Sequence, residues 1–96
     1  MRLAKVQAEE ASLVPFSGDI AWHTGPDPER PGFHIATGYP GGLDGFYILV
    51  QDIGDSLWGW LLMNGEQLPV QMRNGYANEQ LAKTAVAMWL EVNPNG

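Results

Sequence analysis

The sequence contains one strongly helical segment, and it lies near the C-terminal end of the chain. Apolar residues recur there at helical spacing, namely Leu81, Ala85, Met88, Trp89 and Val92, flanked by Ala82, Val86 and Leu90. They form a broad apolar stripe that must pack against another element. A single helix covers only one face of a sheet, so the rest of the chain must form a layer that one helix completes.

Capping residues mark both ends of this helix. Asn78 is a good N-cap, and Glu79 lies in the first turn, where the helix dipole favours an anion. Glu79 can also pair with Lys83 at the i, i+4 spacing. Pro94 cannot continue a helix and Asn93 tolerates a left-handed exit, so the helix is expected to end there.

Short strand-like segments fill the chain before the helix. Residues 45–52 and 56–63 are rich in aromatic and branched side chains and are separated by a turn signal, Ile-Gly-Asp. Residues 19–24 and 33–37 are shorter strand candidates around a loop dense in proline and glycine.

The dipeptide Asn64-Gly65 is the preferred sequence for a two-residue type I′ turn, so residues 66–72 are expected to return as a further strand. Pro69 lacks a backbone donor, so that strand lies at an edge of the sheet or is broken there.

These segments predict an α+β fold, with one domain over residues 1–96. An antiparallel β-meander spans residues 19–72, and one C-terminal α-helix over residues 78–92 packs on it. Residues 1–14 are expected to form a short helix or a mobile arm that ends at Pro15.

Composition restricts the partners. The net charge is −6 with only five Lys and Arg residues, so the chain repels phosphate backbones, and direct nucleic-acid binding is not expected. The same charge favours a basic partner. There is no cysteine, which excludes disulfides and thiolate metal sites.

Targeting and membrane signals are also missing from the sequence. Glu9 and Glu10 interrupt the apolar core of about 7 to 15 residues that a signal peptide needs. The apolar runs 46–50 and 57–63 are far shorter than the roughly 20 residues that span a bilayer. A soluble, cytoplasmic protein without membrane contact is expected.

No group of residues resembles an active site. His23 and His34 are the only histidines, and they lack the spacing of a zinc site. The glycine-rich segment 38–45 lacks the lysine of a phosphate-binding loop, and residues 52–55 do not complete a calcium loop. We therefore expect no enzymatic activity, no metal and no cofactor.

The predicted strands are apolar on both sides. Trp58, Trp60 and Leu62 share one face of their strand, and Leu57, Leu61 and Met63 share the other. The tryptophans are expected to pack under the helix; the alternative is an exposed platform for a sugar ring.

The opposite face is left without a helix. The N-terminal segment, a partner protein or a second copy of the chain would cover it.

Carboxylates are expected to gather at one end of the sheet. If consecutive strands alternate in direction, their loops bring together five acidic residues, Asp27, Glu29, Asp52, Asp55 and Glu79, opposed by Arg30 and Arg73. A row of carboxylates can imitate a phosphate backbone and dock on a basic groove, so these five are the predicted partner-binding residues. The alternative is a solvated end without a role.

The order of elements resembles that of small acidic phage and prophage proteins, among them anti-CRISPR inhibitors. The resemblance covers roughly residues 45–92, from the meander with Trp58 and Trp60 through the Asn64-Gly65 hairpin to the closing helix. It is architectural and transfers no site residue. It implies stoichiometric binding to a host complex that handles nucleic acid.

The leading hypothesis is therefore a non-catalytic inhibitor that docks on a basic surface of a host protein or complex. One alternative is a homodimeric structural or accessory protein that uses its apolar sheet face. Another is a module that binds a small ligand or a sugar through Trp58 and Trp60.

Overall fold

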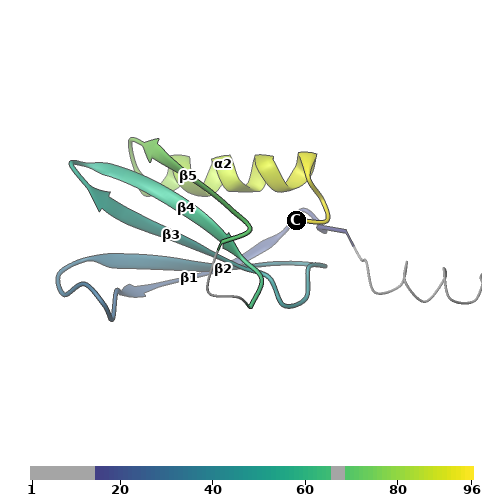
Figure 1. Ribbon diagram of the computed structural model, residues 1–96, viewed down its shortest axis with the longest axis horizontal. Helices are drawn as coiled ribbons and strands as arrows, with labels where there is room; N and C mark the ends of the chain where they lie inside the picture. The colour runs from purple at the N-terminus through teal and green to yellow at the C-terminus, as the bar shows by residue number, and fades with distance from the viewer. Residues whose placement is uncertain (1–14, 66–68) are drawn as a thin grey trace, which may run out of the picture.

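Five antiparallel strands and one helix make up the described part of the chain, residues 15–65 and 69–96 of a computed structural model (Figure 1). The elements are β1 (Ile20–Pro26), β2 (His34–Pro40), β3 (Tyr47–Gly54), β4 (Leu57–Met63), β5 (Gln71–Tyr76) and α2 (Glu79–Val92). Each strand pairs with the next in sequence, in the order β1-β2-β3-β4-β5. The predicted α+β meander with one C-terminal helix is confirmed; the expectations for residues 1–14 lie outside the described residues.

The type I′ turn lies between β3 and β4. Gly54 pairs with Leu57, and the two residues between them, Asp55 and Ser56, have φ values of 56° and 61°. Positive φ at both central residues is the requirement of this turn. The Asp52 carboxylate accepts a hydrogen bond from the Gly54 amide at 2.8 Å, which stabilises the bulge before the turn.

The expected turn at Asn64-Gly65 is wrong. Only Gly65 has a positive φ, and residues 64–70 connect β4 to β5 in place of a two-residue turn. The fifth strand therefore spans residues 71–76 and not 66–72, and residues 66–68 lie outside the described part. It is an edge strand, as predicted. Its pairing begins where the Val70 amide donates to the Leu62 carbonyl at 2.7 Å.

The helix begins as predicted. The Asn78 side chain accepts a hydrogen bond from the Leu81 amide at 2.8 Å, and Lys83 and Glu79 form an ion pair at 2.8 Å. Its exit differs from the expectation, because Asn93 has φ −123° and is not left-handed. The backbone and side-chain N–H groups of Asn93 both donate to the Trp89 carbonyl at 2.9 Å, which satisfies this carbonyl in the last turn without a left-handed residue.

The helix buries a different stripe from the one predicted. Ala82, Val86 and Leu90 are completely buried, whereas Leu81, Met88 and Val92 are exposed, Val92 by 80%. Ala85 and Trp89 pack against the core as expected. The helix is apolar over much of its circumference, so the pattern did not distinguish two stripes one residue apart; contact with the sheet selects the stripe of Ala82, Val86 and Leu90.

Beneath the helix, alternate residues of the central strands form the core. Its members from the sheet are Ala36, Ile48, Val50, Trp60 and Leu62. Trp60 is only 1% exposed, its indole N–H donates to the Tyr76 hydroxyl at 3.2 Å, and its ring lies 5.8 Å from that of Trp89. The core interpretation of Trp58 and Trp60 is confirmed. A sugar platform that uses both rings is wrong, because Trp60 has no free face.

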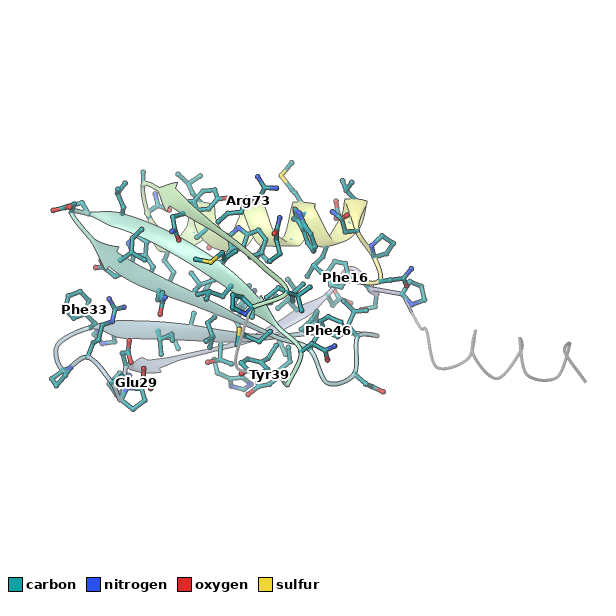
Figure 2. All side chains as sticks on the ribbon, viewed as in Figure 1. Phe16, Glu29, Phe33, Tyr39, Phe46 and Arg73 are labelled. Atoms are coloured by element: carbon teal, nitrogen blue, oxygen red, sulfur yellow. The ribbon has the colours of Figure 1, made fainter. Side chains whose placement is uncertain are left out.

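The two ends of the described chain close the core at the far end of the helix. The Phe16 amide donates to the Pro94 carbonyl at 2.7 Å, and the Ser17 amide donates to the Gly41 carbonyl at 2.8 Å. Figure 2 shows Phe16 and Phe46 at this end, where both rings pack against the core. No helix in the described residues is long and apolar enough to cross a bilayer.

Candidate functional site

The sheet face opposite α2 carries no helix in the part of the chain that the structure describes (Figure 1). One cross-strand row runs over all five strands on this face and consists of His23, Thr37, Leu49, Leu61 and Met72. Three of the five are apolar, and Met72 is 49% exposed. The expected uncovered apolar face is therefore present; we call it the open face.

The open face also carries two exposed ring side chains, His23 and Tyr39, where β1 pairs with β2. Tyr39 is exposed, and its ring meets the edge of the His23 ring at a centroid distance of 5.8 Å. Figure 2 shows Tyr39 on the side of the sheet away from α2. Exposed aromatic rings on a rigid strand offer large contact areas at little entropic cost, as in protein interfaces.

The open face is hollowed into a groove of about 600 Å³. Its lining residues come from the β1–β2 loop, from β2 and from β3: Asp27, Pro28, Glu29, Arg30, Ile35, Thr37, Tyr47, Leu49 and Gln51. Ile35 and Leu49 form an apolar floor, and Thr37, Tyr47 and Gln51 place polar groups around it. This combination of an apolar floor and a few polar groups is typical of binding sites, and the volume lies in their range.

A structured turn forms the wall of the groove. The Arg30 amide donates to the Asp27 carbonyl at 3.3 Å, which closes a β-turn with Pro28 in its second position. The Asp27 carboxylate accepts a hydrogen bond from the Glu29 amide at 2.9 Å. The Asp27 amide donates to the Phe33 carbonyl at 2.8 Å, so both ends of the loop are held together. The wall is therefore preorganised before any ligand arrives.

Arg30 belongs to this wall. Its Nε donates to the Asp27 carboxylate at 3.0 Å, and its guanidinium lies 4.6 Å from the centre of the Phe33 ring. Backbone donation from Glu29 and the hydrogen bond from Arg30 both lower the pKa of Asp27. The Nη2 atom of Arg30 is buried without a hydrogen-bond partner among the described residues. Since Asp27 and Arg30 compensate each other, Glu29 determines the charge at the rim.

The topological part of the acidic-end prediction is confirmed. The β1–β2 loop, the β3–β4 turn and the start of α2 lie at one end of the sheet, on the left in Figure 1. The side chains are not equivalent, however. Asp27 is buried in its turn, Asp52 caps a bulge and Glu79 is paired with Lys83, whereas Glu29 and Asp55 are exposed.

Two further observations limit the acidic-end hypothesis. Arg73 does not oppose these carboxylates, because it lies midway along the edge strand β5, where it pairs with Trp60, and on the α2 side (Figure 2). The opposite end is also acidic, since Asp19, Asp44 and Glu91 are exposed there. Charge alone therefore does not distinguish the predicted end. The predicted end differs from the opposite end in having the groove, because Asp27 and Glu29 belong to the wall of that groove.

The histidines do not converge. Cross-strand pairing places His23 with Thr37 on the open face, whereas His34 pairs with Pro26 and lies on the other face. No group of three His, Cys, Asp or Glu side chains within residues 15–65 and 69–96 could hold a metal ion.

Three polar groove residues were missed by sequence reasoning. Thr37, Tyr47 and Gln51 had no distinguishing motif, and only the folded loop brings a wall beside them. One signal was present in Asp27-Pro28, since aspartate followed by proline favours a type I turn. Comparison with protein-family models, with curated proteins and with solved structures found no match.

Proposed function

We propose that the chain is a non-catalytic binding protein whose open face docks on another protein. The observation that carries the proposal is the groove, which joins an apolar floor to a preorganised acidic wall on a face without a helix in the described residues. Such a surface supplies contact area and orientation to a partner.

The chemistry of the groove favours a basic side chain of the partner. A lysine or arginine stem would lie along Ile35 and Leu49, and its cationic head would reach Glu29 and the amide of Gln51. Arg30 is the opposing charge in the wall, but Asp27 compensates it at 3.0 Å. The partner therefore presents basic residues beside apolar ones.

Asp52 and Asp55 would add long-range attraction to such a surface. They lie in the β3–β4 turn, at the same end as the groove wall. Charges of this kind mainly raise the association rate and are screened over about 8 Å at 0.15 M salt. In its sharpest form, the proposal is an inhibitor of the anti-CRISPR kind that occupies a nucleic-acid-binding surface of a host complex.

Affinity capture from the native host, followed by binding kinetics on the captured protein, tests the proposal. The informative variant is Thr37→Arg, because the long cationic side chain of the new arginine would itself occupy the groove. Thr24→Arg is its matched control, because Thr24 lies on the other sheet face. We expect Thr37→Arg to weaken binding at least about tenfold, and Thr24→Arg to leave it unchanged.

Charge variants distinguish the contribution of the groove to binding from that of the acidic end. Glu29→Gln should weaken the complex mainly by faster dissociation, while Asp52→Asn with Asp55→Asn should slow association. Asp44→Asn, at the opposite end, is the control. DNA or RNA should compete for the partner if its nucleic-acid surface is occupied. Equal binding by wild type and Thr37→Arg would refute the groove, and a catalytic turnover of the captured protein would refute a stoichiometric role.

A further inference from the structure

The two edges of the sheet differ in how well they are protected from pairing with another strand. β5 is irregular, because the register shifts opposite Trp58 and Gly59, and Gly75 takes a φ of 100° as the additional residue. It also carries the cation Arg73 in its centre. Bulges and charged side chains are the usual devices that prevent an edge strand from recruiting a partner.

β1 has neither device. Its seven residues contain no Asp, Glu, Lys or Arg, and it pairs with β2 in an unbroken register from Ile20 to Pro26. Within the described residues β2 is its only strand neighbour. Ala21, His23 and Thr24 are exposed, and only Pro26 lacks a backbone donor. A long, regular and uncharged edge is a template for strand addition.

The α2 side of the sheet next to β1 is also incompletely covered. α2 lies over β3, β4 and β5, so the side chains of Trp22 and Ile20 fill the space above Gly38 in the neighbouring strand. A shallow cleft of about 390 Å³ runs between Trp22 and the outer side of α2, where Met88 is 61% exposed.

We propose that β1 pairs antiparallel with β1 of a second copy of the chain, which makes one continuous sheet from two molecules. The pair is isologous, since the same strand serves both copies. In this arrangement the two α2 helices lie on the same side of the joined sheet and flank both Trp22 rings. Growth stops at two copies, because the bulged β5 edge is unsuited to pairing.

This dimer is independent of the proposed function. Edge pairing leaves the open face and its groove accessible in both copies, so each molecule keeps its own binding surface. Both copies carry a net charge of −6, and their mutual repulsion is screened by salt. The dimer should therefore strengthen as the salt concentration rises, whereas the charge-steered partner complex should form more slowly.

Sedimentation equilibrium of the purified chain at increasing protein and salt concentrations tests the proposal. We expect the mass to approach twice 10.5 kDa at high concentration. The double variant Ala21→Lys with His23→Lys places two cations on the β1 edge and should raise the dissociation constant at least about tenfold. Met72→Lys is the control, since it places one added cation on the other edge strand, β5, and on the same open face.

A second measurement does not depend on variants. In hydrogen exchange of the wild-type chain, the β1 amides that do not bond to β2 should become protected as protein concentration rises, while β5 amides should not. A monomer at every concentration would overturn the proposal. So would a dimer that Met72→Lys abolishes and the β1 variant preserves, because that result would indicate association through the open face.

Discussion

Leu90 and Met88 lie two residues apart on α2, yet replacing Leu90 by alanine should destabilise the fold far more than replacing Met88. Leu90 is completely buried in the core cluster, whereas Met88 is 61% exposed. Leu90→Ala removes three buried carbons, which corresponds to about 2.4 kcal/mol at about 0.8 kcal/mol per carbon. The cavity left behind adds to this, so the free energy of unfolding should fall by about 2 to 5 kcal/mol.

Met88→Ala should change the same free energy by less than about 0.5 kcal/mol. Its side chain contributes little burial, and alanine is at least as good a helix former as methionine. The pair is a sharp comparison because both variants end in the same residue, on the same helix, within one turn.

Urea denaturation followed by circular dichroism measures both values, with an unchanged slope as the check for two-state unfolding. A domain of this size holds about 5 to 15 kcal/mol in total, so Leu90→Ala should still fold. Its melting temperature should fall by at least about 8 °C. If Met88→Ala proved the more damaging of the two, the helix would have to be rotated on the sheet, and the assigned core would be wrong.

Three other sites allow equally direct tests. Gly38→Ala should destabilise by about 1 to 3 kcal/mol, because a Cβ there would come within 2.6 Å of an indole ring, whereas Gly25→Ala meets no atom within 4 Å and serves as the control in thermal melts. The pKa of Asp27 is lower in the folded than in the unfolded chain, so its ionised carboxylate stabilises the fold at pH values above the unfolded pKa near 3.8. This stabilisation is lost as the pH falls through the folded pKa. Acid titrations should therefore show a weaker loss of stability for Asp27→Asn than for wild type. Tyr76→Phe removes the acceptor of a buried indole N–H and should lower the free energy of unfolding by about 1 to 3 kcal/mol in urea denaturation.

The helix and its start could be predicted because both depend on short-range interactions. The Asn78 cap and the pair of Glu79 with Lys83 join groups three and four residues apart, so sequence spacing alone specifies them. Four strands were located by their aromatic and branched residues. The alternation in β3 and β4 also predicted an open face, because one helix cannot cover two apolar surfaces.

One error arose because a turn sequence does not by itself produce a turn. The hairpin between the third and fourth strands formed as expected, with its tight turn at Asp55-Ser56, but Asn64-Gly65 did not form a second type I′ turn, and the fifth strand moved to residues 71–76. The register of the fifth strand is set by its pairing with β4, in which Leu62 lies opposite Gln71. Such a contact between two strands cannot be predicted from the turn propensity of a dipeptide.

Only the tertiary structure decided which surfaces are buried and which remain to bind. The helix offered two apolar stripes one residue apart, and its contact with β3, β4 and β5 buried Leu90 and exposed Met88. The groove likewise requires the β1–β2 loop to lie beside β3, which brings Glu29 close to Gln51 although more than twenty residues separate them. Local patterns specify elements, because their interactions are short; a binding surface depends on how distant elements pack, and that packing is a property of the whole fold.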